Sequence, residues 1–441
     1  MKIVHLTPGA GGMFCGACMR DNALAGALRR LGHEVSLVPL YTPLTLDEPA
    51  EIEERIFFGG VNVYLQQKSA LFRHTPQWLD NSLDNQQLLR AAARLAVKTK
   101  PAELGELTLS MLKGEEGHQA KELEKLIAWL TARPGVDVLC LSNILLAGLA
   151  RRLRAALSAP IVCTLQGEDF FLDGLPSPQR EQAWELLTQR AADMSAFIAV
   201  SRYYAGVMGA RLRLPAEKVR VVHNGIDLSG YEPAPQKPAA PAVGYLARLA
   251  PEKGLSTLSA AFKILHERGK VPGVRLRIAG SLTPGDKPFV EQLSAGLAQD
   301  GLAQHVDIVP NLDRQQKIGF LQSLSVFSVP AVYGESFGLY VLEALACGVP
   351  VVQPRHGPFP EILEATGGGI LCAPGDPADL AAKLEELLLD ENRRSALGRA
   401  GREKVLADFS IERAARDTVN VFQSCTAGVP PASGSAGVPP A

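Results

Sequence analysis

Short apolar runs alternate with helical patterns along most of the chain. The runs are rich in valine, isoleucine and leucine at consecutive positions, as in parallel-sheet strands that are buried on both faces. Helical patterns lie between most of them, which predicts right-handed βαβ units and a doubly wound α/β fold. The predicted strands are residues 2–6, 34–38, 61–65, 136–141, 161–164, 197–200, 219–222, 243–246, 274–279, 306–309, 326–329 and 349–352.

A proline-rich stretch divides this pattern into two halves. Four prolines fall between Pro233 and Pro241, and no periodic pattern continues through them, so we place a linker at residues 228–241. A chain of 441 residues is also too long for one ordinary hydrophobic core. The sequence therefore predicts two Rossmann-like parallel-sheet domains that face each other across a cleft, at residues 1–227 and 242–405.

Three other segments depart from the alternation. Residues 66–132 are almost purely helical in pattern and predict an insertion, which is either a site for a second substrate or a helical cap with ordinary core aromatics. Residues 406–425 are predicted to form a C-terminal helix that packs back on the N-terminal domain. Residues 426–441 are rich in alanine, glycine and proline, repeat AGVPPA and have little to bury, which predicts disorder.

Composition narrows the classes of protein. The charges, 45 Lys and Arg against 46 Asp and Glu, give a net charge of -1, which argues against a general nucleic-acid binder. The seven cysteines are scattered and mostly lie in apolar runs, a pattern typical of a reducing compartment. We see neither a signal-peptide pattern nor an apolar run of about 18 residues, so we expect a soluble, cytoplasmic protein.

The segment YGESFGLYVLEALACGVPVV, residues 333–352, has the pattern of a loop, a helix and a strand. Glu335 lies before the predicted helix and Glu343 inside it. An ionised glutamate in so apolar a helix is costly to bury, so Glu343 either reaches solvent or binds something polar. The backbone amides of Phe337, Gly338 and Leu339 would point forward from the helix N-terminus, a position that favours an anion such as a phosphate. This segment predicts a site for a sugar attached to a phosphate.

The segment GYLARLAPEKGLSTL, residues 244–258, ends a predicted strand and opens a helix at Gly254. Arg248 and Lys253 lie in the loop between them, where ligands of open α/β domains bind. Two cations and a helix N-terminus can neutralise a diphosphate leaving group without a metal ion, and the chain has no Asp-x-Asp pair. The alternative is a solvated surface pair, which the placement of the two cations after a strand disfavours.

Taken together, these segments resemble family 4 of the glycosyltransferases, which have the GT-B fold. The matching text is ESFGLYVLE, ARLAPEKG, HNGID at residues 223–227 and PGAGGM near the N-terminus, in the family's order from about residue 2 to 424. The resemblance implies a retaining hexosyl- or related transferase that moves a sugar from a nucleotide diphosphate to a hydroxyl acceptor. It implies no metal or other cofactor, with a uridine diphosphate sugar as the most frequent co-substrate.

The resemblance also implies roles for the donor-side residues. Glu335 would contact the donor sugar's hydroxyls, the amides of Ser336, Phe337, Gly338 and Leu339 the sugar and diphosphate, and Glu343 the ribose. Arg248 and Lys253 would hold the diphosphate and, with Glu335, form the catalytic set. Gly11 and Gly12 would let the N-terminal loop approach the donor, and Asn311 would lie in the loop that contacts the base.

On the acceptor side the chain departs from the family. In CTLQGEDFF the family usually has histidine where Gln166 stands, and glutamine can hydrogen-bond a sugar hydroxyl but carries neither proton nor charge. Glu168 and Asp169 are therefore candidates for orienting the acceptor. Arg20, Asp21 and Asn22, near the glycine-rich loop, are further candidates for acceptor contact.

Cys15 and Cys18 form a CxxC pair at a predicted helix start. A thioredoxin-like redox pair or a zinc half-site is one interpretation, but the chain is too long for the former and lacks a second pair for the latter. The other interpretation is that both thiols are small packing residues beside the donor loop. His33, after the helix-stopping Gly32, is expected to be structural.

Three rival functions stay open at this point. A nucleotide-sugar epimerase can use the same two-domain fold, a redox or metal protein would use Cys15 and Cys18, and a silent sugar-binding protein would bind without turnover. The expected partners are a nucleotide-sugar donor and an unidentified carbohydrate or other hydroxyl acceptor, with no nucleic acid. Weak peripheral membrane contact through the basic residues 90–100 is a further hypothesis.

Overall fold

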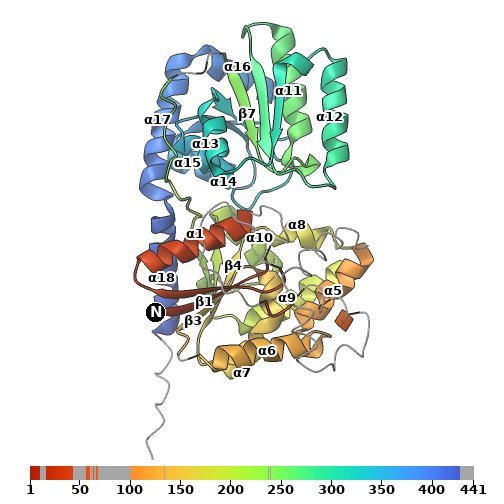
Figure 1. The fold of residues 1–441 in the computed structure, drawn as a ribbon, viewed down its shortest axis with the longest axis vertical. Coiled ribbons are helices and arrows are strands. Elements are labelled where there is room, and N and C mark those ends of the chain that lie inside the picture. Colours follow the sequence, from red (N-terminus) through yellow and green to blue (C-terminus); the bar gives the residue numbers. More distant parts are fainter. Residues whose placement is uncertain are drawn as a thin grey trace, which may run out of the picture.

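The computed structural model describes residues 1–9, 16–42, 56–59, 63, 66, 67, 101–133, 135–236, 238 and 240–427. Within these residues the chain forms two six-stranded sheets in which every neighbouring pair of strands is parallel. The predicted doubly wound α/β class is therefore confirmed. Figure 1 shows the two sheets as separate bodies, the second above the first.

The first sheet is built from the N-terminal half of the chain. Its strands are β1 (Lys2–Thr7), β2 (Glu34–Pro39), β3 (Val138–Leu141), β4 (Ile161–Leu165), β5 (Ala196–Ala199) and β6 (Val219–Val221). They lie in the order β2-β1-β3-β4-β5-β6, so the direction of winding reverses between β1 and β3. The helices of this half are α1 (Gly16–Arg30), α5 (Pro101–Lys113), α6 (Ala120–Thr131), α7 (Ala150–Ala156), α8 (Glu168–Asp173), α9 (Gln179–Arg190) and α10 (Arg202–Arg211).

The second sheet follows the proline-rich segment. Its strands are β7 (Ala242–Leu246), β8 (Arg275–Gly280), β9 (Val306–Pro310), β10 (Val326–Phe327), β11 (Val351–Pro354) and β12 (Gly369–Cys372), in the order β12-β11-β10-β7-β8-β9. The winding reverses between β7 and β10. The helices of this half are α11 (Leu255–Arg268), α12 (Lys287–Gln299), α13 (Arg314–Gln322), α14 (Leu339–Ala346), α15 (Phe359–Thr366), α16 (Pro377–Leu389) and α17 (Glu391–Asp408).

Two strand predictions differ from the structure. In the predicted strand at 61–65 the described residue, Val63, is helical and its backbone N–H donates to Gly59 O at 3.0 Å. A short apolar run looks alike in a buried strand and on the buried side of a helix, which is why the prediction was wrong there. Strand β12 was missed because glycines at 367 and 368 precede it and its run of Gly369 to Cys372 is short.

The C-terminal helices connect the two halves. Helix α17 packs on α14 and α15 of the second half, and α18 (Ile411–Thr426) packs on α1 and β5 of the first (Figure 1). The chain therefore passes between the halves twice, and the two passages pair through Ile226, whose N–H donates to Phe409 O at 3.0 Å. Gly225 permits this approach, because a Cβ there would lie 2.3 Å from Ser410 O. Among the described helices, none combines the length and the apolar composition needed to cross a bilayer.

Candidate active site

Two loops leave the second sheet where its winding reverses. The loop after β7 covers residues 247–254 and the loop after β10 covers residues 328–338. In open α/β sheets, ligands bind outside the carboxyl ends of the strands at such a reversal. Both segments that the sequence singled out therefore border one site.

Lys253 and Glu335 meet at this site. The Lys253 ammonium hydrogen-bonds the Glu335 carboxylate and lies 2.6 Å from the Tyr333 hydroxyl oxygen. The Tyr340 hydroxyl donates to the same carboxylate oxygen at 3.1 Å, and Glu335 is only 7% exposed. Burial raises the pKa of Tyr333 and the Glu335 charge raises it further, so this hydroxyl stays neutral while it accepts the hydrogen bond from Lys253. The result is a partly buried cation and a buried carboxylate held between two tyrosines.

A glycine makes this meeting geometrically possible. Gly254 has φ of +77° and caps α11, and a Cβ at this position would lie 1.8 Å from Pro330 O. The loop after β7 thus runs directly against the loop after β10. Only a residue without a side chain fits both the left-handed backbone and the close approach.

Arg248 lies farther out, in the same loop as Lys253. Its guanidinium pairs with Glu252, and its side chain is 45% exposed. The Arg248 backbone carbonyl accepts a hydrogen bond from the Tyr245 hydroxyl at 3.0 Å, which fixes where the loop leaves the strand. Arg248 is therefore at the mouth of the site, and an anion that binds there competes with Glu252.

Helix α14 begins beside Glu335. Its N-cap is Gly338, with φ of +91°, and Phe337 before it is almost completely buried. The first-turn amides of a helix lack intrahelical acceptors and carry the positive end of the helix dipole. The predicted anion-binding segment is thus a helix N-terminus that adjoins the cation of Lys253.

Glu343 has its polar partners within the protein. Its Oε1 accepts from Lys317 Nζ at 2.8 Å and from the Tyr231 hydroxyl at 2.9 Å. Burial alone would raise the pKa of Glu343, but the charge and hydrogen bond of Lys317 lower it below its ordinary value. Lys317 of α13 and Tyr231 are therefore the polar partners that burial of Glu343 needs, and its contact with a donor ribose stays a prediction.

Asn311 lies at the end of β9 with a left-handed backbone, φ of +57°. Its N–H donates to Gly280 O at 2.8 Å, and its Oδ1 accepts from the Leu282 N–H at 3.0 Å. It thus joins the loops after β8 and β9. No other described residue of the candidate set contacts it through a hydrogen bond.

On the first half, the loop after β4 holds Gln166, Glu168 and Asp169. The buried Glu168 carboxylate accepts from the N–H groups of Gln166 at 2.9 Å, Gly167 at 3.0 Å and Ile144 at 3.2 Å. Burial raises the pKa of Glu168, and these hydrogen bonds offset part of the rise. Glu168 therefore holds the loop in shape, while Asp169 is half-buried and bonds Tyr204.

Contacts between the halves bring this loop to the donor-side loop. Ser336 Oγ donates to Gln166 O at 2.9 Å, and Ser201 Oγ donates to Ser336 O at 2.7 Å. The ring of Phe170 lies 4.8 Å from that of Tyr333. The carboxyl edges of the two sheets consequently face each other, with Glu335 and Gln166 on opposite sides of the boundary.

Arg20 and Asn22 lie on α1 and are only 6% and 5% exposed. The Arg20 guanidinium bonds Asp21 Oδ1 at 3.0 Å and Asn224 Oδ1 at 3.2 Å. Its charge is used inside the protein, so the expectation of direct acceptor contact is not supported at Arg20. His33 Nδ1 lies 3.2 Å from the N-terminal amine and has the structural position expected of it.

Gly11, Gly12 and Cys15 lie outside the described residues, as do residues 90–100 and 428–441. Cys18 is buried at 1% exposure. The described residues contain no cluster of three or more histidine, cysteine, aspartate or glutamate side chains arranged to hold a metal ion. For Cys18 the structure shows a packing position.

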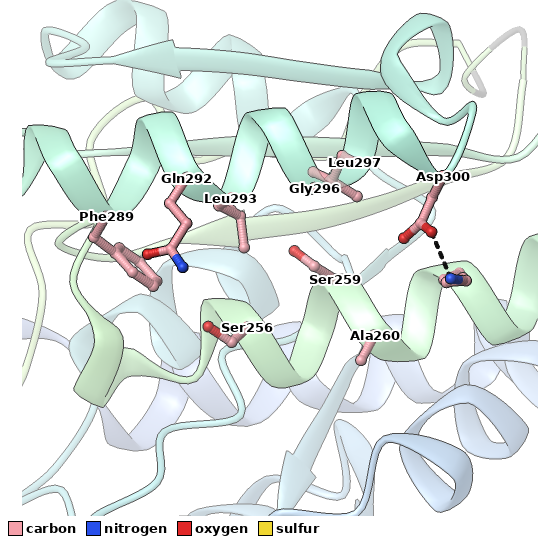
Figure 2. Close-up of a pocket in the computed structure, with 10 residues that line it drawn as sticks. Ser256, Ser259, Ala260, Phe289, Gln292, Leu293, Gly296, Leu297 and Asp300 are labelled. Carbon is pink, nitrogen blue, oxygen red and sulfur yellow. Dashed lines mark hydrogen bonds and ion pairs between the residues drawn. The ribbon is translucent and has the colours of Figure 1, made fainter.

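A separate hollow lies between α11 and α12, with a volume of about 380 Å³. Figure 2 shows Phe289 and Leu293 of α12 facing Ser256 and Ser259 of α11, with Asp300 bonded at the far end. Asp300 pairs with Lys263, with 2.5 Å between Oδ1 and Nζ. None of the predicted site residues lines this hollow.

Several residues of the site were missed by the sequence analysis. Tyr333 and Tyr340 flank Glu335 in the singled-out segment, so an aromatic at both positions was an available signal. Lys317 and Ser142 gave no signal, because each reaches its partner only after the sheet has formed.

Comparison with known proteins agrees with this geometry. Residues 233–404 match the family described as "Glycosyl transferases group 1", and residues 108–229 match the one described as "Glycosyltransferase Family 4". The chain belongs to glycosyltransferase family 4. The two matches meet near the proline-rich segment, so one lies in each half of this transferase-family chain.

Individual relatives agree with the family. A D-inositol 3-phosphate glycosyltransferase from Segniliparus rotundus is 27% identical over 68% of the chain and 66% of its own length. The first relatives in the comparison are aligned over 50–66% of their length. Sucrose-phosphate synthase from Thermosynechococcus elongatus has a TM-score of 0.71 at 20% identity, with 97% of this chain and 99% of that chain covered. Anabaena HepE, solved with UDP, has a TM-score of 0.67 at 19% identity, with 96% and 100% covered. This chain therefore has the GT-B fold of these solved structures.

Proposed function

We propose that the protein is a retaining, metal-independent glycosyltransferase that moves a sugar from a nucleotide diphosphate to a hydroxyl group of an acceptor. The observation that carries the proposal is the contact of Lys253 with Glu335 at the reversal of the second sheet, opposite the Gln166 loop. This contact places a cation, a carboxylate and a helix N-terminus around one point. The UDP bound to Anabaena HepE supports a uridine nucleotide as the first donor to test.

The residues supply the electrostatics that such a transfer needs. When the bond between the sugar C1 and the phosphate oxygen breaks, its electron pair stays on the diphosphate. Lys253, Arg248 and the first amides of α14 are positioned to stabilise that charge. Glu335 would then accept hydrogen bonds from the sugar hydroxyls, while the Tyr340 hydroxyl keeps its hydrogen bond to the Glu335 carboxylate.

In the single-step mechanism proposed here, retention follows because the acceptor approaches from the face that the diphosphate leaves. The acceptor oxygen then forms the new bond to C1, and its proton passes to the departing phosphate oxygen. A facing loop at Gln166 and a closed contact at Ser336 would exclude water from this step. The relatives' names include different acceptors, so the proposal commits only to a hydroxyl group.

The test begins with a thermal-shift screen of UDP, GDP and ADP and their sugars, because a ligand of the native state raises the melting temperature. Nucleotide release is then measured with the donor that binds. Lys253→Ala and Glu335→Ala should each abolish turnover with the fold intact. Lys263→Ala is the matched control, since Lys263 pairs with Asp300 away from the site.

Further readouts separate the parts of the proposal. Proton NMR of the product should show the donor's anomeric configuration, and a chelator should not change the rate. Wild-type turnover in Lys253→Ala would refute the assigned site. An isomerised donor sugar without transfer would identify an epimerase instead.

A further inference from the structure

A buried charged pair joins the loops at the crevice edge of the first sheet. Asp21, with 0% exposure, accepts hydrogen bonds from Arg20 Nη1 at 3.0 Å, Thr7 Oγ1 at 3.0 Å and Ser142 Oγ at 2.5 Å. Thr7 ends β1 and Ser142 follows β3, so the carboxylate connects the two strands between which the winding reverses. Arg20 extends the connection to Asn224 in the segment between the halves.

The electrostatics of this pair fix its protonation. Burial alone would raise the pKa of Asp21, but the charge of His5, followed by the charge of Arg20, lowers it below the ordinary value. His5 Nε2 lies 3.5 Å from Asp21 Oδ1. The carboxylate therefore accepts hydrogen bonds and donates none.

The hydrogen bond from Ser142 to Asp21 in turn fixes the orientation of the Gln166 side chain. A serine hydroxyl has one proton, and that of Ser142 goes to Asp21. Gln166 Nε2 lies 2.6 Å from Ser142 O and 3.1 Å from Ser142 Oγ, and both oxygens can only accept there. The amide must therefore turn its NH₂ group toward Ser142 and its Oε1 away.

The amide oxygen of Gln166 is left for a ligand. The side chain is half-buried, and no described residue donates to Oε1. The Gln166 main chain is held from both halves, since its N–H donates to Glu168 and its carbonyl accepts from Ser336, the neighbour of Glu335. An oxygen with no proton of its own requires a donor such as a hydroxyl.

We propose that Asp21 and Ser142 are positioning residues that fix the Gln166 amide so that its Oε1 accepts a hydrogen bond from a hydroxyl of the sugar substrate. The inference rests on the proposed function. It gives a role to Arg20 and Asp21 of α1, which are 6% and 0% exposed. It also explains how Gln166, which carries no charge, can bind a sugar hydroxyl at this position.

The first test compares two buried serines. Ser142→Ala removes the hydroxyl that links Asp21 to Gln166 and leaves the charged pair intact. Ser110→Ala is the matched control, because the Ser110 hydroxyl likewise donates to a side-chain oxygen, that of Gln119 at 2.7 Å, within the helical insertion. With the nucleotide sugar that the screen above identifies, Ser142→Ala should lower kcat about tenfold, as expected for one hydrogen bond. The melting-point shift caused by UDP should stay unchanged, and Ser110→Ala should keep wild-type turnover.

A double-mutant cycle tests the route through Gln166. If Ser142 acts through the amide, Ser142→Ala should cost no further activity in a Gln166→Ala background. Multiplying losses would show an independent structural role and overturn the inference. Asp21→Asn should follow the same pattern if it folds.

Hydrogen exchange gives a readout that needs no substrate. Ser142→Ala should speed amide exchange at residues 166–168, and Ser110→Ala should not. Unchanged exchange together with wild-type turnover in Ser142→Ala would refute the inference while the proposed function stands. A wild-type protein that turns over no nucleotide sugar would overturn the proposed function, and this inference with it.

Discussion

The ion pair of Lys317 with Glu343 gives a sharp prediction about stability. Lys317 lies on α13 and Glu343 on α14, with side chains only 12% and 15% exposed and 2.8 Å between Nζ and Oε1. The variant Lys317→Met keeps most of the aliphatic stem and removes the charge. Among the described residues, Glu343 then keeps its hydrogen bond from the Tyr231 hydroxyl.

The magnitude follows from burial. Removing one partner of a buried ion pair costs about 3–5 kcal/mol, because the other charge stays buried without compensation. The tyrosine hydroxyl and the residual exposure place this pair at the lower end, at about 3 kcal/mol. For a domain of this size, that corresponds to a fall in Tm of about 6–12 °C. Calorimetry of the unfolding transition of the second domain measures this fall in Tm.

The dependence on pH has a definite sign. In the wild type the folded-state pKa of Glu343 lies below its ordinary value, so the pair stabilises the fold above the ordinary pKa and the benefit is lost as pH falls. In Lys317→Met, burial dominates and the folded state prefers the protonated acid. The difference in unfolding free energy between wild type and variant should therefore shrink from pH 7 toward about pH 4.

Two comparisons make the prediction refutable. Lys263→Met breaks the exposed pair of Lys263 with Asp300, whose side chains are 42% and 36% exposed, and should lower the unfolding free energy much less than Lys317→Met does, because solvent screens exposed charges. A cycle with Glu343→Gln isolates the coupling between the two charges. A loss below about 1 kcal/mol in Lys317→Met, or a loss that does not change with pH, would show that the pair is solvated rather than buried.

Three further predictions follow from single contacts. Gly254→Ala should lower the unfolding free energy by about 3 kcal/mol or more by calorimetry, because its Cβ would lie 1.8 Å from Pro330 O. The Cys140 thiol, with its pKa raised to about 12 by burial, should resist iodoacetamide at pH 8 until the protein is unfolded by urea. Glu361→Gln should weaken the contact between the halves, since His223 Nε2 lies 2.6 Å from its carboxylate; solution scattering would then give a larger radius of gyration, and an unchanged radius would refute this.

Much of the fold followed from local patterns. Runs such as Ile161 to Leu165 are apolar on both faces, so a buried parallel strand was the economical interpretation and the structure contains it. Short runs failed where periodicity carries little information, at Val63 and at β12. Helix α14 was predicted because Gly338 and Gly348 stand on either side of an apolar segment and each ends the helical pattern there.

The candidate site could be predicted only in part. The residue types of Lys253 and Glu335 were evident from their segments, but their contact across 82 positions was not. Glu343 was recognised as a carboxylate in need of a polar partner, but its protein partners Lys317 and Tyr231 could not be named from the sequence. Lys317 lies 26 residues earlier on another helix, and no periodicity relates the two.

The sequence by itself determined which segments become strands, which loops carry charge and which family the chain resembles, because hydrophobic period and glycine placement act over a few neighbouring residues. Only the tertiary structure decided that Asp21 meets Ser142, 121 positions away, and that Gln166 faces the loop of Glu335. The reason is that strand order, which no local pattern encodes, brings distant loops to one edge of each sheet and sets the direction in which a shared proton must point.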